Sequence, residues 1–377
     1  MHLLVALQYY LPNYTGYTLH VVRAVEALAA RGHRVTVLAA RQPPTLPARE
    51  TVNGVDVIRL AAPLRVSRGA VMPGYPGHAY RLAGPADAIW INTPLLETAL
   101  WAAVAKLRGK RLVITHHGDL HLPPGAKNRA IEAFTFANYR VAAAAATTIV
   151  AYSDDYANFS PYLRPWRNKV RVINAPIVIP SPQPEGVAAL RARLNPGGGP
   201  IVGYAGRFVL EKRPDLLLRA ALELRPLLPD LRVAFAGVNK ISYEDTWAQT
   251  SALVDKVGDT AVFLGLIADA QALANFYAAC DVLVLPSDTE CFGTVQVEAM
   301  LCGTPAIVSD IPGLRAVVMA TGMGRLFARG DAGALAAAIA DVLADRSRFL
   351  RPREAIQREF DLARTTAAYE AVFFGPH

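Results

Sequence analysis

Short, continuously apolar runs alternate along the first half of the chain with longer segments in which apolar residues recur every three or four positions. The apolar runs predict β-strands at residues 3–7, 34–39, 55–60, 88–91, 111–115 and 148–151. The longer segments predict helices at residues 21–30, 95–107 and 130–145. Strands without polar alternation are buried on both faces, so the pattern indicates an α/β fold with a mostly parallel sheet between two helical layers.

The same alternation starts again after residues 174–200, a segment rich in proline and glycine. It predicts strands at residues 201–204, 232–236, 261–264, 282–285, 306–308 and 325–327, and a final helical pattern at 354–373. A chain of 377 residues is long enough for two domains with separate cores. We therefore predict two Rossmann-like, doubly wound domains at residues 1–178 and 179–355, followed by a terminal helix at 356–377.

Composition excludes several classes of protein. With 53% hydrophobic and 19% charged residues the chain is globular, and its apolar runs are too short for transmembrane helices. The first residues read as a strand and lack a basic leader, so we expect no signal peptide and a cytoplasmic location. Three cysteines without metal-ligand spacing are expected to be reduced and buried.

Charge is distributed unevenly between the two halves. Residues 1–180 carry 20 Lys and Arg against 9 Asp and Glu, whereas residues 181–377 carry 19 against 22. This asymmetry predicts that the first half meets an anionic partner. Residues 64–80, rich in Gly and Pro, combine arginines with Met72, Tyr75 and Tyr80, and we expect a functional or mobile loop there.

Two motifs follow strands of the second half. After strand 282–285 comes Glu290-Cys291-Phe292-Gly293-Thr294-Val295-Gln296-Val297-Glu298, which leads into an apolar helix. The N–H groups at a helix start attract phosphate, and carboxylates accept hydrogen bonds from sugar hydroxyls. Arg207 and Lys212 follow strand 201–204. The arginine guanidinium can bind two phosphate oxygens at once and the lysine ammonium adds a compact positive charge, so the two residues suit a diphosphate. Ligands of open α/β sheets bind at such strand ends.

These motifs, together with Cys302-Gly303-Thr304-Pro305 and the strand ending His116-His117-Gly118-Asp119, resemble family 4 retaining glycosyltransferases of the GT-B fold. The resemblance covers nearly the whole chain. It implies two domains facing a cleft and a last helix that returns to the first domain. The first loop departs from the family pattern, because Thr15-Gly16 stands where a Gly-Gly pair is usual.

The resemblance also implies roles for individual residues. The catalytic set would be His117, Glu290, Arg207 and Lys212. The donor would be held by Gly16, Arg207, Lys212, Phe292, Gly293, Thr294, Val295 and Glu298, with Glu298 on the ribose hydroxyls and Glu290 on the sugar. We expect His116 to point away from the site and Asp119 either to orient the histidine or the acceptor, or to lie solvated in its turn.

No metal or other cofactor is expected. Asp154-Asp155 follows Ser153 and reads as the capped start of a helix, and cationic side chains can neutralise a leaving diphosphate. The first half shows no obvious carboxylate nucleophile, which favours same-face attack by the acceptor hydroxyl. The expected donor is a UDP-sugar, with GDP-mannose next. The expected acceptor is a lipid or lipid-linked glycan at an anionic membrane surface, and no nucleic acid is involved.

Three other classes of protein are alternatives to a glycosyltransferase. A nicotinamide dehydrogenase would need Gly-x-Gly-x-x-Gly after the first strand, where this chain has Leu11-Pro12-Asn13-Tyr14-Thr15-Gly16. A two-lobed nucleotide-sugar-binding protein would be exported, which the expected lack of a signal peptide disfavours. A nucleotide-sugar epimerase on the same fold stays open.

Overall fold

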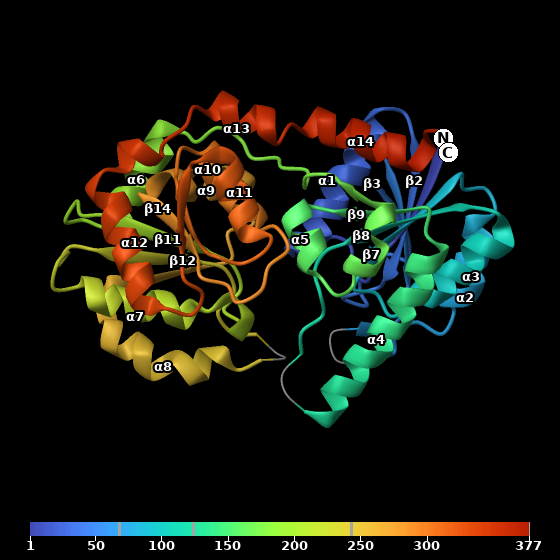
Figure 1. The fold of residues 1–377 in the computed structure, drawn as a ribbon, viewed down its shortest axis with the longest axis horizontal. Helices are drawn as coiled ribbons and strands as arrows, with labels where there is room; N and C mark the ends of the chain where they lie inside the picture. The colour runs from blue at the N-terminus through green and yellow to red at the C-terminus, as the bar shows by residue number, and fades with distance from the viewer. Residues whose placement is uncertain (67–68, 123–124, 242–243, 377) are drawn as a thin grey trace. The chain divides into compact units, whose positions relative to one another are not determined.

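The computed structural model describes residues 1–66, 69–122, 125–241 and 244–376. The chain forms two compact units. Unit 1 consists of Met1–Pro176 with Leu362–His377, and unit 2 consists of Ile177–Asp361. Figure 1 shows an α/β layering in each unit, with a central sheet between helices. The expected α/β class with two doubly wound domains is confirmed.

Unit 1 is built on an eight-stranded sheet in the order β10-β9-β8-β7-β1-β2-β4-β3. Every pair in it is parallel except β3–β4. The strands are β1 (His2–Ala6), β2 (Arg34–Ala40), β3 (Arg49–Val52), β4 (Val55–Leu60), β7 (Ala88–Thr93), β8 (Arg111–His116), β9 (Thr148–Ala151) and β10 (Val170–Val172). The order reverses at β1, so the carboxyl ends of β1 and β7 flank a switch point where ligands of this architecture bind.

The helices of unit 1 are α1 (Gly16–Ala30), α2 (Tyr75–Ala83), α3 (Thr98–Arg108), α4 (Ala126–Ala145), α5 (Asp154–Phe159) and α14 (Leu362–Phe374). Helix α14 comes from the end of the chain and packs against α1, β7 and β8 (Figure 1). Its Tyr369 and Phe373 are buried beside Trp90, and the Tyr369 hydroxyl lies 2.9 Å from His20 Nε2.

The segment at residues 64–80 is not the loop that the sequence suggested. It contains the short antiparallel strands β5 (Leu64–Val66) and β6 (Gly69–Val71) and the start of α2. Met72 and Tyr75 are 3% and 1% exposed, so their burial in unit 1 organises this Gly- and Pro-rich stretch. Residues 67–68 lie outside the described part of the chain.

Unit 2 is built on a parallel six-stranded sheet in the order β13-β12-β11-β14-β15-β16. The strands are β11 (Ile201–Ala205), β12 (Arg232–Ala236), β13 (Ala261–Gly265), β14 (Val282–Leu285), β15 (Ala306–Ser309) and β16 (Gly324–Phe327). The helices are α6 (Pro184–Leu194), α7 (Pro214–Leu224), α8 (Thr246–Val257), α9 (Ala270–Ala279), α10 (Thr294–Leu301), α11 (Leu314–Thr321), α12 (Ala332–Ala344) and α13 (Arg353–Glu359).

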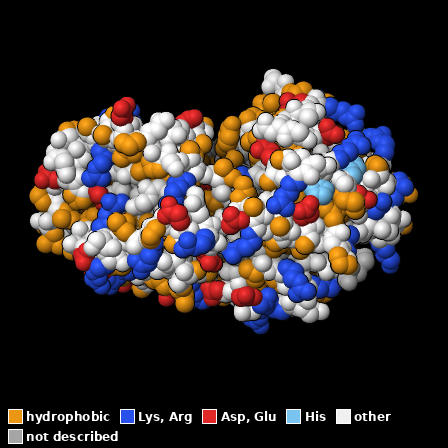
Figure 2. All heavy atoms as spheres, turned by 90° about the horizontal axis from the view of Figure 1, so that it is seen from above, with side chains coloured by type: hydrophobic (Ala, Val, Ile, Leu, Met, Phe, Trp, Pro, Cys, Tyr) orange, Lys and Arg blue, Asp and Glu red, His pale blue; other side chains and the backbone are white. Residues whose placement is uncertain are grey.

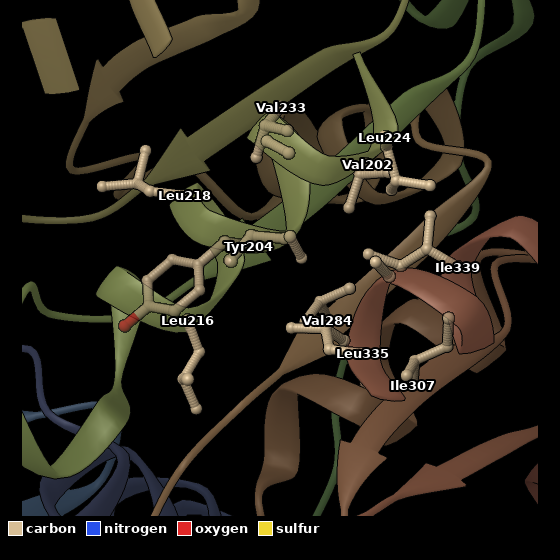
Figure 3. Close-up of a cluster of buried hydrophobic side chains, with 14 of the residues drawn as sticks. Val202, Tyr204, Leu216, Leu218, Leu224, Val233, Val284, Ile307, Leu335 and Ile339 are labelled. Atoms are coloured by element: carbon tan, nitrogen blue, oxygen red, sulfur yellow. The ribbon is translucent and has the colours of Figure 1, made fainter. Parts of the chain in front are cut away.

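Figure 3 shows how the core of unit 2 forms between the sheet and two helices. Val202 and Val284 from adjacent strands meet Leu216 of α7 and Leu335 and Ile339 of α12, and all are buried. This core fixes β11 and β14 beside each other, and with them the loops that leave their carboxyl ends.

The last helical pattern, expected as one element at residues 354–373, is two helices in different units. Helix α13 belongs to unit 2 and α14 to unit 1. Between them Phe360 is 5% exposed and meets Phe292 with ring centroids 5.8 Å apart. Unit 2 extends to Asp361, six residues beyond the expected boundary at 355.

Candidate active site

The charged residues of both sequence motifs lie after neighbouring strands of unit 2. Arg207 and Lys212 follow β11, Glu290 follows β14, and these two strands pair in parallel. Parallel neighbours end at the same edge of a sheet, so the two loops lie side by side. The structure therefore brings together the cations and the carboxylate that the sequence placed 78 residues apart.

Lys212 and Glu290 are bound directly to each other. The Lys212 ammonium donates a hydrogen bond to Glu290 Oε2, and the two side chains are 24% and 17% exposed. Burial acts to lower the pKa of Lys212, but the charge of Glu290 and its hydrogen bond outweigh burial and raise it. The lysine is therefore a firmly charged cation held by the carboxylate.

Arg207 lies at the same strand end. Its guanidinium is 3.6 Å from Glu211 Oε1, and its carbonyl accepts a hydrogen bond of 2.9 Å from the Tyr204 hydroxyl. The backbone of this turn packs closely against Gly237, where a Cβ atom would lie 2.0 Å from the Gly206 carbonyl oxygen. Gly237 thus lets the loop after β12 approach the loop that carries Arg207.

Helix α10 begins at a turn that requires glycine. Gly293 has φ 70° and ψ 67°, and a Cβ there would meet Leu314 Cδ2 at 2.5 Å. Thr294 and Val295 form the first turn, whose N–H groups have no partner within the helix. Phe292 is 3% exposed and its ring packs against Phe360, so its side chain is part of the interior of unit 2.

Glu298 lies one turn further along α10 and is 4% exposed. The Tyr277 hydroxyl of α9 donates a hydrogen bond of 2.9 Å to Glu298 Oε2. Tyr277 in turn is fixed by Thr304, whose hydroxyl donates to the Tyr277 carbonyl at 2.7 Å. Sequence analysis missed Tyr277, because nothing local links a tyrosine on one helix to a glutamate 21 residues later.

In unit 1, His117 directly follows β8. Its Nε2 lies 2.8 Å from Asn92 Oδ1 and its Nδ1 lies 2.5 Å from the Tyr152 hydroxyl. The amide oxygen can only accept, so the ring carries its proton on Nε2 and accepts from Tyr152. Burial, then the charges of His20 and His116, hold the pKa of His117 well below its usual range. His117 is therefore a neutral, oriented imidazole.

The neighbouring His116 points the other way, into unit 1. It is 1% exposed, with Nε2 at 2.8 Å from Asp119 Oδ1 and Nδ1 at 3.1 Å from the Thr93 hydroxyl. Asp119, 2% exposed at its side chain, also accepts from Ser160 at 2.5 Å. Asp119 is thus neither a solvated turn residue nor the partner of His117, because it orients His116.

The remaining expected residues lie at helix starts. Gly16 begins α1, where the Thr15 hydroxyl accepts from Thr18 N–H at 3.1 Å. Ser153 caps α5 by accepting from Tyr156 N–H at 3.1 Å. Asp154 stands in the first turn of α5 and pairs with Arg167 at 2.6 Å, which confirms the helix-start interpretation of Asp154-Asp155.

Glu97 is a carboxylate at the carboxyl edge of the first sheet that sequence analysis did not single out. It follows β7 and precedes α3, and within the described part of the chain its Oε2 is buried without a hydrogen-bond partner. Burial raises the pKa of Glu97 to about 7. In the sequence it looks like an ordinary acidic residue at a helix start, so only its burial identifies it.

Two protein families and several known proteins match this chain. The family described as "Glycosyl transferase 4-like domain" matches residues 15–176, and "Glycosyl transferases group 1" matches residues 188–359. A GDP-mannose-dependent alpha-mannosyltransferase of Mycolicibacterium smegmatis is 29% identical over 93% of this chain and 90% of its own. A D-inositol 3-phosphate glycosyltransferase of Catenulispora acidiphila is 27% identical over 88% of this chain and 83% of its own.

Solved structures show the same fold. Sucrose-phosphate synthase from Thermosynechococcus elongatus superposes with a TM-score of 0.81 at 25% identity, over 99% of this chain and 98% of its own. Anabaena HepE in complex with UDP-glucose superposes with a TM-score of 0.78 at 20% identity, over 98% of each chain. The fold and these relatives together indicate a GT-B glycosyltransferase that uses a nucleotide-sugar donor. The chain belongs to glycosyltransferase family 4.

Proposed function

We propose that this enzyme is a retaining hexosyltransferase that moves a sugar from a nucleoside diphosphate to an acceptor hydroxyl. The observation that carries the proposal is the Lys212–Glu290 pair beside the Gly293 turn, on adjacent strand ends. A diphosphate and a sugar are the two chemical groups that such a cation, carboxylate and helix start would bind together.

Within this proposal, Glu298 accepts from the ribose hydroxyls and is aimed by Tyr277. The backbone N–H groups of Gly293, Thr294 and Val295, with Phe292 N–H and that of Gly16, face the donor phosphates. Arg207 and Lys212 neutralise the diphosphate, Glu290 binds the sugar hydroxyls, and the neutral His117 contacts the sugar.

The bond that breaks joins the anomeric carbon to the diphosphate oxygen. Negative charge grows on that oxygen as the bond lengthens, and Arg207 and Lys212 are the groups that stabilise it. The acceptor oxygen bonds to the same face of the carbon, and its proton passes to the departing diphosphate. This scheme assigns the charge neutralisation to side chains and needs no metal ion, so we expect activity to survive a chelator.

Two donors are candidates. A UDP-sugar is the expectation from the family, and the name of the Anabaena complex includes UDP-glucose. The mannosyltransferase relative, which matches most of this chain, is named as GDP-mannose-dependent and supports GDP-mannose equally. Both should be tested side by side, with nucleoside diphosphate release as the readout.

The acceptor is proposed to be a lipid or lipid-linked glycan at the inner face of the cytoplasmic membrane. The support is the excess of Lys and Arg over Asp and Glu in residues 1–180. The burial of Met72 and Tyr75 removes them as membrane contacts, which leaves Tyr80, 45% exposed, and the exposed cations of this half to provide the attraction. Among the described residues, no helix is both long and apolar enough to span a bilayer.

The deciding experiment incubates the enzyme with UDP-glucose or GDP-mannose, with and without a membrane-lipid extract. Nucleoside diphosphate release that depends on the extract, with a labelled lipid product of retained configuration, supports the proposal. Conversion of the donor into an isomer without acceptor would instead indicate an epimerase. Tight donor binding with no turnover on any extract would indicate a binding protein.

A further inference from the structure

Arg213 adopts a backbone conformation that normally belongs to glycine. Its φ is 48° and its ψ is 50°, at the junction between Lys212 and the first turn of α7. A side chain in this left-handed region costs free energy that glycine would avoid. Strained residues of this kind persist where surrounding contacts hold them, and they are frequent at functional sites.

The Arg213 guanidinium joins two carboxylates from different loops. Its Nε and Nη2 donate to the two oxygens of Asp215 at 2.9 and 3.0 Å. Its Nη1 donates to Asp288 Oδ2 at 3.1 Å. Asp215 belongs to the start of α7, whereas Asp288 lies in the loop after β14. Arg213 therefore ties the loop after β11 to the loop after β14.

A second set of contacts reinforces this link. Asp288 N–H donates to the Glu211 carbonyl at 2.8 Å, so the two loops also meet through the backbone. Asp288 Oδ1 accepts from Arg329 Nε at 3.1 Å, which connects both loops to the segment after β16. The side chains of Arg213, Asp215 and Asp288 are 21%, 20% and 27% exposed, so solvent screens these pairs only in part.

The linked residues stand next to the proposed catalytic pair. Lys212 precedes Arg213 by one position, and Glu290 follows Asp288 by two. We propose that Arg213 and Asp288 are positioning residues that hold Lys212 and Glu290 in register across the two loops. This inference rests on the proposed function for its effect on turnover, but the effect on the Lys212–Glu290 pair can be measured without turnover.

The test uses Arg213→Gly and Asp288→Asn, with Arg219→Ala as matched control. Glycine accepts the positive φ, so Arg213→Gly removes the link and relieves strain, and it should fold. Arg219 lies 3.8 Å from the same Asp215, four residues away on the same helix, and is 60% exposed, so this pair stays within α7. Arg213→Lys keeps the positive charge and should retain part of the wild-type kcat.

We expect Arg213→Gly and Asp288→Asn to lower kcat on the order of ten- to a hundredfold, with donor KM and Tm nearly unchanged. Arg219→Ala should match wild type. Wild-type kcat in Arg213→Gly would overturn the inference. So would a loss of kcat that follows a loss of folded protein.

A readout independent of turnover separates this inference from the proposed function. Carbon-13 methylation of the lysines allows the Lys212 pKa to be titrated by NMR. If the link holds the pair together, the pKa of Lys212 falls towards its ordinary value in Arg213→Gly and not in Arg219→Ala. An unchanged Lys212 pKa would contradict the inference even in a protein that transfers no sugar.

Discussion

Lys212 and Glu290 are assigned to different parts of the donor, yet they are hydrogen-bonded to each other. An ammonium group has three N–H donors, so in the proposed scheme a diphosphate can accept from Lys212 beside Glu290, and the two anions compete for the charge of the lysine. Glu290 also accepts from the sugar hydroxyls in that scheme. The negative charge of Glu290 should therefore oppose binding of a nucleoside diphosphate that carries no sugar.

Glu290→Gln should separate these two effects. The neutral amide no longer competes for Lys212, so affinity for UDP or GDP should rise about two- to fivefold, as expected for a partly exposed ion pair worth about 0.5–1 kcal/mol. Transfer should fall because the charged acceptor for the sugar is lost. Calorimetry measures the diphosphate affinity, and steady-state kinetics measure the transfer. Asp310→Asn is the control, because Asp310 forms a different ion pair, with Arg315. Unchanged diphosphate affinity would contradict this competition for Lys212.

Glu97 predicts a pH dependence of stability. Its pKa is about 7 in the fold and near 4.5 when unfolded, so the unfolded state loses this proton first as pH rises. Stability from this residue therefore declines between pH 4.5 and 7, by roughly 3 kcal/mol at most. Glu97→Gln should match wild type near pH 4.5 and be more stable at pH 8 in urea unfolding. An exposed control, Glu223→Gln, should show no such difference. Equal stability of Glu97→Gln and wild type at pH 8 would refute the assignment.

At the scale of the elements, periodicity predicted the strands of both sheets that carry site residues. It failed at residues 64–80, because β5, β6 and α2 are organised by burial of Met72 and Tyr75 rather than by a local pattern. The motifs predicted His117 as a site residue. Its partners Asn92 and Tyr152 lie 25 and 35 residues away in the sequence, and they contact it because β7, β8 and β9 are neighbours in the sheet. The positive φ of Arg213 likewise has no sequence signal, since arginine rarely adopts it.

The turn between β14 and α10 gives a prediction about one element. Gly293→Ala should cost roughly 1–3 kcal/mol of stability from the strained φ, and more from the clash with Leu314. It should also weaken UDP or GDP binding, because the N–H groups of α10 would move. Gly303→Ala shares a positive φ of 83° but has nothing within 4 Å of the new Cβ, so it should lose stability alone. Equal diphosphate affinity in both variants would argue against phosphate binding at α10.

At the scale of the whole molecule, the basic excess belongs to the part of the chain that forms most of unit 1. Its exposed cations include Lys106, Lys127, Arg129 and Arg140. In the view of Figure 2, Lys and Arg side chains are scattered over both units among acidic and hydrophobic ones. Attraction to a membrane would therefore rest on many dispersed charges and should be reversible.

Vesicle cosedimentation tests this attraction. We expect binding to anionic but not to neutral liposomes, at about 1 kcal/mol for each cation near the surface, and its loss at high salt. Lys127→Glu with Arg129→Glu should weaken binding, whereas Lys256→Glu, an exposed lysine of unit 2, should not. Failure to bind either kind of liposome at low salt would leave a soluble acceptor as the better proposal.

In the proposed function, Lys212 of unit 2 stabilises the charge on the departing nucleoside diphosphate. The most direct measurement is kcat of wild type and Lys212→Ala at saturating donor, with UDP-glucose and GDP-mannose each tried. We expect kcat to fall on the order of a hundred- to a thousandfold, because the lysine acts most strongly on the charge that develops as the bond breaks. A Lys212→Ala enzyme with near-normal kcat would contradict it.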